Sequence, residues 1–492
     1  MSFNRYDAYL YGDVGKCCGL FRDTHGFLLE WLWYRTYPTV IDNQAWKEEL
    51  THMKKWILGL SILLILGLGS AGAALAATSA RTTSASGNAS ADTSRISGAT
   101  VTAWNQELLH IVQTPGAQPA TVHPTRSFAI LHAGIYDAVV SITRDASPYG
   151  ISLQAPRNAR PDAAAATAGH DTLVALYPTM RAELDQLLAN QLSKIPDGAG
   201  KQQGIQVGHT IVSQILALRA HDGSAATPQP FSPGNQPGNY QPTPPNFAAP
   251  VFTNWGNVTP FVLNNAAQFR PAPPPALDSQ AYAQALNEVK SLGQNTSTTR
   301  TADQTMIAKF WAGPIWNTWN EIAENAALTR HTNLERTARM FAVLNLSFAD
   351  GVIAFYDAKY HYQLWRPITA IREADTDGNP ATVGDPTWTP LATTPADPSY
   401  PGAHSVISAI GAGVLSAFFG ERNHVSVTSD VLPGIVRTFE SYTDVATEAG
   451  LSRIFAGVHT RLDHDAGLKL GNNVAHFALL QLGIEKGDRI GS

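Results

Sequence analysis

Cysteine is almost absent from this chain of 492 residues. The two cysteines, Cys17 and Cys18, are adjacent and lie near the N-terminus. A disulfide framework and a cysteine-based zinc site are therefore excluded for the rest of the chain. The fold has to be held by packing, and any metal or oxyanion has to be bound through nitrogen and oxygen atoms.

Charged residues are also scarce, at 15% of the chain against 44% hydrophobic residues. Lys and Arg number 34 and Asp and Glu number 39, which leaves a net charge of −5. A nucleic-acid-binding protein normally shows a basic patch, so we expect no nucleic-acid partner. A chain of this length and low charge can bury a large core, which argues against global disorder.

One uncharged apolar run lies in the N-terminal part of the chain. The sequence Met-Lys-Lys at 53–55 precedes a run from Trp56 to Ala76 that ends in small residues. This order is typical of a secretory signal peptide over 53–76. It predicts a secreted or periplasmic protein with no stable membrane partner after cleavage, and residues 1–52 as a non-native leader. The alternative is a single membrane anchor preceded by a short cytoplasmic segment.

Strand-like alternation is scarce as well, whereas apolar residues recur at three- and four-residue spacing. A Ser/Thr/Ala/Gly tract over 77–100 predicts a flexible leader. Helices are predicted over 103–112, 126–142, 180–192, 205–218, 279–292, 301–311, 319–328, 334–362 and 406–419. Residues 228–275 hold 13 of the 31 prolines and predict a long ordered loop. We expect an all-α protein of packed helix bundles, with an N-terminal half (101–275, including the proline-rich connection) and a C-terminal half (276–492).

Two cations stand out in the sequence AKYHYQLWRP. Lys359 and Arg366 are seven residues apart, so on one helix they would share a face. Two such cations repel each other unless an anion lies between them. Bulky neighbours such as Trp365 favour a partly enclosed pair, although a solvated basic face is the alternative.

A turn rich in proline and glycine, PSYPGAHS at 398–405, leads into the apolar run that ends at Phe419. The first backbone N–H groups of such a helix are unpaired and favour an anion. His404 at this position could exchange a proton with a bound oxyanion. The alternative is a histidine that only caps the helix.

A third motif is SRIFAGVHTRLD at 452–463. His459 and Asp463 are four residues apart, so on a helix the carboxylate could orient the imidazole. Arg453 could reach the same pocket as a planar clamp for phosphate or vanadate. A surface ion pair is the alternative interpretation.

The three motifs in this order resemble the signature of the type 2 phosphatidic acid phosphatase and vanadium-dependent haloperoxidase superfamily. The stretches RSFAILHAGIYDAVVSI (126–142), YQPTPPNFAAP…NWGNVTPF (240–261) and RPITAIREADTDGNP (366–380) are similar to the bacterial haloperoxidase-like branch. The resemblance extends over nearly all of 101–484.

The resemblance implies a role for each residue of the motifs. Lys359, Arg366 and Arg453 would hold the oxygens of vanadate, or of phosphate in the same site. His404 would be the general acid or base. His459 would be the ligand of the vanadium or a nucleophile that takes up a phosphoryl group, positioned by Asp463.

The sequence departs from the family at one point. The family turn reads Ser-Gly-His, whereas this chain has Gly402 and Ala403 before the histidine, so only backbone N–H groups remain there. The resemblance implies a haloperoxidase that uses hydrogen peroxide and halide. A phosphatase that hydrolyses phosphomonoesters through a phosphohistidine is the alternative, and a non-catalytic oxyanion-binding protein is a third.

Overall fold

The computed structural model describes residues 96–484, which belong to one compact unit. The predicted leader 1–52, the predicted signal peptide 53–76 and most of the predicted flexible segment 77–100 lie outside the described residues. Secretion therefore stays a prediction.

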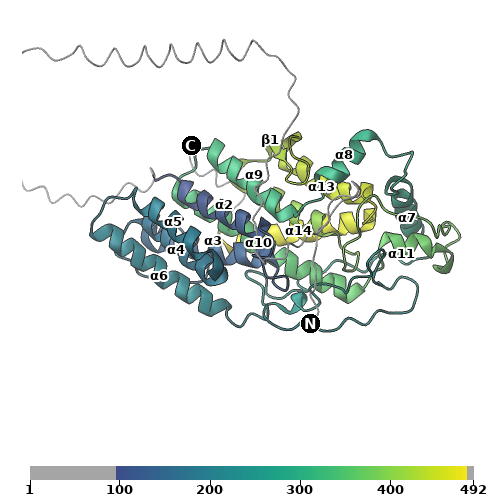
Figure 1. Cartoon of the computed structure of the whole chain (residues 1–492), viewed down its shortest axis with the longest axis horizontal. Coiled ribbons are helices and arrows are strands. Elements are labelled where there is room, and N and C mark those ends of the chain that lie inside the picture. The colour runs from purple at the N-terminus through teal and green to yellow at the C-terminus, as the bar shows by residue number, and fades with distance from the viewer. Residues whose placement is uncertain (1–95, 485–492) are drawn as a thin grey trace, which may run out of the picture. The chain divides into compact units, whose positions relative to one another are not determined.

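Helices dominate the described residues (Figure 1). The first group comprises α2 (Ala99–Gln113), α3 (Pro124–Thr143), α4 (Pro161–Leu176), η2 (Pro178–Met180), α5 (Arg181–Leu192) and α6 (Ala199–Arg219). The second comprises α7 (Gln280–Leu292), α8 (Ala302–Phe310), α9 (Ile315–Thr329), α10 (Leu334–Tyr362), α11 (Pro367–Arg372), η4 (Ala374–Thr376), α12 (Ala403–Phe419), α13 (Tyr442–Phe455) and α14 (Arg461–Gln481). Every predicted helix is confirmed, with ends displaced by at most six residues, and so is the all-α class. α4, α11, α13 and α14 were not among the predicted helices. The alanine-rich α4 was missed because it is buried on most sides and lacks a clear helical period.

The central helix of the core is α10, which packs against α3 and α12. The side chain of Asn333 caps its start by accepting from the N–H of Arg336 at 2.9 Å. The helix ends because Gln363 adopts a left-handed φ of 50°. α10 is long and apolar enough to span a membrane, but 94% of its most apolar window is buried inside the protein.

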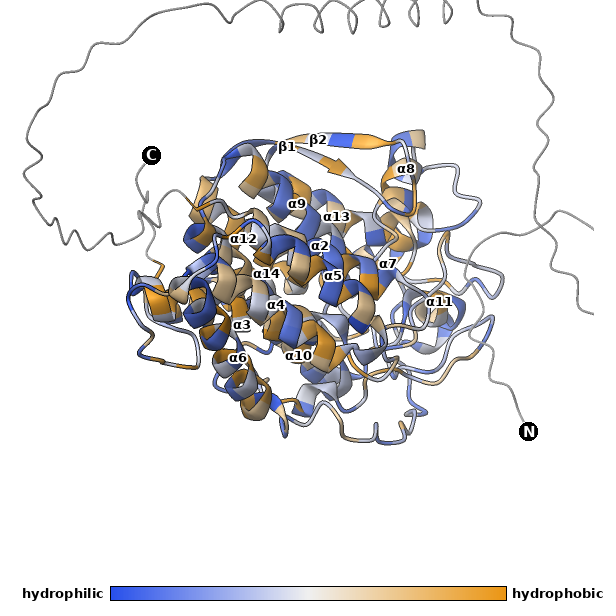
Figure 2. Cartoon of the chain, turned by 60° about the vertical axis from the view of Figure 1, so that its left-hand side comes forward, coloured by the Kyte–Doolittle hydropathy of each residue, from blue (hydrophilic) through white to orange (hydrophobic). Residues whose placement is uncertain are grey.

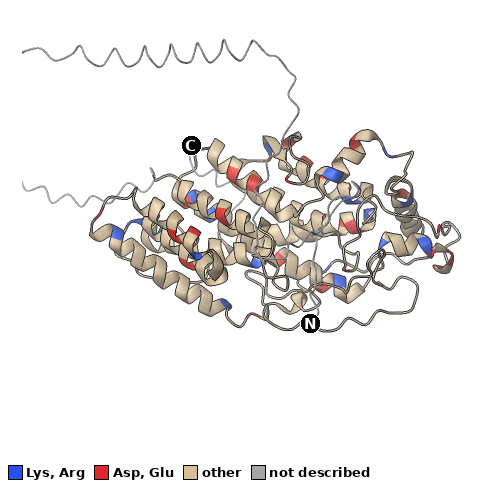
Figure 3. Cartoon of the chain, in the orientation of Figure 1, with Lys and Arg blue, Asp and Glu red and all other residues tan. Residues whose placement is uncertain are grey.

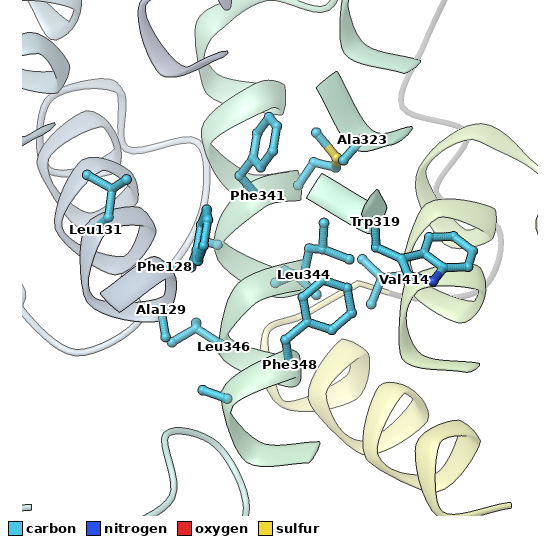
Figure 4. Close-up of a cluster of buried hydrophobic side chains, with 14 of the residues drawn as sticks. Phe128, Ala129, Leu131, Trp319, Ala323, Phe341, Leu344, Leu346, Phe348 and Val414 are labelled. Atoms are coloured by element: carbon cyan, nitrogen blue, oxygen red, sulfur yellow. The ribbon is translucent and has the colours of Figure 1, made fainter. Parts of the chain in front are cut away.

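Large apolar side chains from several helices meet along α10 (Figure 4). Those drawn are Phe341, Leu344, Leu346 and Phe348 of α10, Phe128, Ala129 and Leu131 of α3, Trp319 and Ala323 of α9, and Val414 of α12. All of them belong to one continuous cluster of buried residues. The hydrophobic core therefore runs through both predicted halves of the chain.

The proline-rich segment 228–275 is an ordered loop in which the short η3 (Trp255–Asn257) interrupts irregular backbone. Its end is fixed on α10 by the buried carboxylate of Asp350. That carboxylate accepts three backbone N–H groups, from Phe261 at 2.6 Å and from Val262 and Leu263 at 2.7 Å each. Such bonds satisfy the backbone of a loop that has no regular partner.

A short antiparallel hairpin, which was not predicted, forms the two-stranded sheet of the described residues. β1 (Arg422–Thr428) pairs with β2 (Val436–Ser441), and Val425 lies opposite Phe439. β1 alternates between exposed and buried side chains, with Val425 and Val427 inward. The hairpin lies at one edge of the helical body, where β1 contacts α9 (Figure 2).

The start of α14 lies close to the start of α12. A side chain at Gly467 would place its Cβ 2.6 Å from the carbonyl oxygen of Gly402, so only glycine permits this approach. The close approach of α12 and α14 brings two of the predicted motifs together.

Charged residues are few along the described part of the chain, and Lys and Arg are interspersed with Asp and Glu (Figure 3).

Candidate active site

Lys359 and Arg366 converge, but they do not share a helix. Lys359 lies in the last turn of α10, whereas Arg366 is the residue that caps the start of α11. Pro367 begins α11, because proline suits the first position of a helix and cannot continue α10. The expectation of one shared helical face is therefore wrong. Both side chains are nonetheless buried, as the enclosed interpretation predicts.

The anion that lies between these two cations is Asp397. Its Oδ2 lies 3.2 Å from Lys359 Nζ, and its Oδ1 accepts from the terminal NH2 of Arg366. Burial alone would raise the pKa of Asp397, but Lys359 and Arg366 outweigh it and hold this pKa below the usual range. The sequence analysis missed Asp397, although an acidic residue next to the 398–405 turn was a visible signal.

His459 lies just before α14 and not on it, so the expectation of two positions on one helix is wrong. Thr460 caps α14, and Asp463 completes a capping box with it. Asp463 Oδ2 accepts from the N–H of Thr460 at 2.7 Å and from Ser399 Oγ at 2.8 Å, and it lies 3.2 Å from His459 Nδ1. The expected pairing of His459 with Asp463 is thus confirmed through a different local structure.

The environment of His459 fixes its protonation. Because Asp463 accepts at Nδ1, the hydrogen is assigned to Nδ1, and Nε2 faces an NH1 hydrogen of Arg366 at 3.1 Å. Burial and then the Arg366 charge lower the pKa of His459 to about 3. The imidazole is neutral near pH 7 and presents a lone pair at Nε2 in a basic pocket.

Arg453 is the cation of this site that lacks a counterion within hydrogen-bond distance. It lies in the last turn of α13, and its buried Nη1 has no hydrogen-bond partner. Burial and then the Arg366 charge lower the pKa of Arg453 to about 10. A buried guanidinium donor without an acceptor indicates that an anion belongs beside it.

The turn between α13 and α14 links Arg453 to His459. The carbonyl oxygen of Arg453 accepts from the N–H groups of Val458 at 3.1 Å and His459 at 3.3 Å. Gly457 has φ 79°, in the left-handed region, and a Cβ there would lie 2.4 Å from the carbonyl oxygen of Gly293. The turn therefore needs glycine at this position to carry its two functional residues.

Gly402 and Ala403 form the start of α12, as the sequence predicts. Gly402 caps the helix without a side chain, and its N–H donates to the carbonyl oxygen of Asp463 at 2.9 Å. A Cβ on Gly402 would lie 3.2 Å from that same oxygen, so a serine here needs a small displacement of α14. The following N–H groups of α12 lack partners within the helix and favour an anion.

His404 follows in the first turn of α12. Its Nε2 lies 2.9 Å from the carbonyl oxygen of Trp311, which assigns a hydrogen to Nε2. Burial and then the Arg453 charge hold the pKa of His404 well below the usual range. The indole of Trp311 in turn donates to Glu448 at 3.0 Å, and Glu448 also accepts from Arg437 at 2.6 Å.

The structure therefore brings the predicted residues together in one cluster, in which Lys359, Arg366, Arg453, His459 and Asp463 are buried and Ala403 and His404 are partly exposed, and it adds Asp397 and Ser399. Three cations, two neutral imidazoles and a helix start meet in this cluster. This donor set suits a tetrahedral or trigonal oxyanion, and the imidazole Nε2 of His459 can bind a central atom. The orphaned Nη1 of Arg453 fits such a group.

Comparisons with known proteins agree with this chemistry. The family model of the VCPO second helical-bundle domain matches residues 339–482. The vanadium chloroperoxidase of Curvularia inaequalis is 24% identical in an alignment 485 residues long, gaps included, that covers 73% of this chain and 78% of that protein.

Two solved structures have the same fold. A bacterial vanadium-dependent iodoperoxidase matches with a TM-score of 0.68 and 25% identity, over 79% of this chain and 97% of that one. A holo-type bacterial vanadium-dependent chloroperoxidase matches with a TM-score of 0.59 and 16% identity, over 76% and 95%. The segment 339–482 holds every predicted site residue, and the sequence and fold similarities agree in relating this chain to the vanadium haloperoxidases.

Proposed function

We propose that this chain is an enzyme of the vanadium-dependent haloperoxidase type, which binds vanadate and uses hydrogen peroxide to oxidise halide. The similarity to the chloroperoxidase and the iodoperoxidase supports this activity. The observation that carries it is the pairing of a buried, unpartnered donor, Arg453 Nη1, with the neutral imidazole of His459 in the same basic pocket.

In this proposal the cations Lys359, Arg366 and Arg453 hold the oxygens of the oxyanion, which is vanadate or, in its place, phosphate. The N–H groups at the start of α12, at Ala403 and the residue after it, add further donors. His459 Nε2 is the nitrogen available to the vanadium. When bound, vanadate supplies the activation of hydrogen peroxide toward halide.

The other residues of the pocket manage protons. Asp463 keeps a hydrogen on His459 Nδ1, so the lone pair is on Nε2, where it accepts from Arg366 NH1 at 3.1 Å and would be taken over by the oxyanion on binding. His404 is neutral, and with Nε2 donating to the Trp311 carbonyl its Nδ1 can accept a proton from a peroxide oxygen. His459 and Asp463 are buried, which strengthens the interaction between them.

A phosphomonoester is the second substrate class that the geometry supports. A neutral His459 oriented by a carboxylate is equally suited to attack phosphorus at Nε2. His404 would first have to take up a proton from solvent at Nδ1 before it could protonate the leaving oxygen. The same donors would hold the phosphate oxygens.

Halide oxidation by phosphate-free protein tests the proposal. With orthovanadate and hydrogen peroxide, we expect halogenation of an acceptor dye by the wild type with iodide, bromide or chloride. His459→Ala should abolish it, because the ligand nitrogen is lost. His476→Ala, an exposed histidine of α14, is the matched control and should keep the activity.

Two outcomes of these assays would contradict the proposal. A vanadate-loaded wild type that oxidises none of the three halides, yet hydrolyses phosphomonoesters in a reaction lost with His459→Ala, assigns the chain to the phosphatases. Vanadate-dependent halide oxidation that survives His459→Ala would remove this residue from the site.

A further inference from the structure

Asp397 places a carboxylate where the oxyanion pocket offers its donors. Asp397 is 6% exposed, and its carboxylate contacts both Lys359 and Arg366. A pocket built to bind an anion thus contains an anion of its own. The consequence for binding follows from which donors this carboxylate occupies.

Every donor of Lys359 is already in use. An ammonium group has three hydrogens. Lys359 Nζ donates to the carbonyl oxygens of Pro398 and of Ser399, the latter at 3.1 Å, and its third contact is Asp397 Oδ2 at 3.2 Å. Of these three acceptors, only the Asp397 carboxylate belongs to a side chain that can rotate away.

Arg366 is occupied to nearly the same extent, since four of its five N–H hydrogens have acceptors. Its Nε donates to the backbone carbonyl of Asp397 at 2.7 Å, and its NH2 donates to the Asp397 carboxylate. Its NH1 donates to the carbonyl oxygen of Val458 at 2.9 Å and to Nε2 of His459 at 3.1 Å. An incoming oxyanion therefore finds Arg453 and one NH2 hydrogen of Arg366 free, and has to compete for Lys359 and for the other donors of Arg366.

The charge balance points the same way. Asp397 and Asp463 offset two of the three positive charges of the pocket, and the histidines are neutral. Asp463 uses its Oδ2 for His459, Thr460 and Ser399, and its buried Oδ1 has no hydrogen-bond partner, so it forms no hydrogen bond with a cation of the site. Asp397 is the carboxylate that contacts both Lys359 and Arg366, whereas Asp463 acts on Lys359 only through its charge.

We propose that Asp397 is a specificity-determining residue of the oxyanion site: it holds Lys359 and Arg366 when no oxyanion is bound, and gives up these donors on binding. This inference rests on the proposed function. The competition weakens oxyanion binding and disfavours doubly charged oxyanions most, because repulsion by Asp397 grows with the charge of the ligand.

The test is the affinity of Asp397→Asn for orthovanadate, inorganic phosphate and sulfate, measured by calorimetry. The amide keeps the shape and removes the charge. We expect about tenfold tighter vanadate and phosphate binding, which corresponds to about 1.4 kcal/mol, and a larger gain for sulfate. Unchanged or weaker binding overturns the inference, because it would make Asp397 a structural counterion only.

Asp222→Asn is the matched control. Asp222 is a buried carboxylate that contacts two arginines, Arg126 at 2.8 Å and Arg219 at 3.0 Å, outside the pocket. It should leave all three affinities unchanged. A similar gain in this control would overturn the inference, since the effect would then not depend on the pocket.

A wild-type measurement covers the case in which Asp397→Asn does not fold. In crystals of wild type grown with and without vanadate, the Asp397 carboxylate should leave Lys359 and Arg366 when vanadate is bound. A carboxylate that keeps both contacts in the loaded crystals overturns the inference. If neither wild type nor Asp397→Asn binds any oxyanion, the proposed function fails too. If wild type binds and Arg453→Met weakens binding while Asp397→Asn does not tighten it, the inference alone fails.

Discussion

The variant Arg453→Met tests whether Arg453 binds the oxyanion or only stabilises the fold. In the free protein, Arg453 Nη1 is a buried donor without a partner, so its removal takes away an unpaired buried group. Arg453→Met keeps the length of the side chain and should leave the stability of the ligand-free protein unchanged or raised. A structural arginine would show the opposite.

The magnitude of the binding loss follows from the bond that is removed. A hydrogen bond to a charged group contributes about 1.5–3 kcal/mol, and the loss should weaken vanadate or phosphate binding by about 10- to 150-fold. Calorimetric titration of phosphate-free protein measures this. The added stability that saturating phosphate gives in a thermal melt should shrink in parallel.

Arg219→Met is the matched control for this prediction. Arg219 is also buried, but it is fully partnered by Asp222 and by the carbonyl oxygens of Thr259 at 2.6 Å and Pro260 at 3.1 Å. Its loss should destabilise the free protein by about 3–5 kcal/mol and leave oxyanion affinity unchanged. Unaltered vanadate affinity in Arg453→Met would refute the reasoning, because the unpartnered donor would then not face the oxyanion.

Three further predictions concern the surroundings of the site. Gly457→Ala should lower the free energy of unfolding, measured in urea titrations, by more than about 1 kcal/mol, because the added Cβ would lie 2.4 Å from the carbonyl oxygen of Gly293. It should also weaken phosphate binding. Wild-type values for both measurements would contradict the need for glycine. Glu448→Gln should reduce the rate of halide oxidation and shift its pH profile at unchanged vanadate affinity, since it weakens the contact that fixes Trp311, whose carbonyl orients His404; a fall in affinity alone would contradict this positioning role. Burial lowers the pKa of His132 from 6.5 to about 3, so the unfolded chain takes up a proton in this window that the folded chain does not. The His132 contribution to stability is therefore present above pH 6.5 and is lost as the pH falls toward 3; urea midpoints of His132→Gln should fall less steeply than those of wild type across this range, and equal slopes would count against it.

Local patterns in the sequence identified most of the site. The cations, the histidines and the Pro/Gly turn can be identified from residue types alone. Helical periodicity located α10 and α12, because apolar residues recur at helical spacing along both segments. Capping was less well predicted. The sequence Arg366-Pro367 begins a new helix, and Thr460 with Asp463 starts α14 after His459, so two expected shared helices are two helix starts.

Only the tertiary structure revealed Asp397 between two cations and the hydroxyl of Ser399 on the carboxylate that orients His459. These contacts join residues that lie 31 to 64 positions apart in the chain.

The sequence by itself determined the all-α class and the chemical types gathered for oxyanion binding, since each depends on side-chain identity or on spacing within one segment. The tertiary structure decided which donors are free and which are occupied. The reason is that hydrogen-bond partners and local charge depend on how closely the helices pack. The approach of α12 to α14, for example, requires glycine at 467, and nothing in the sequence around this glycine indicates which helix it contacts. Arg453 is thus unpaired, and Lys359 is paired, for reasons that lie outside their own segments.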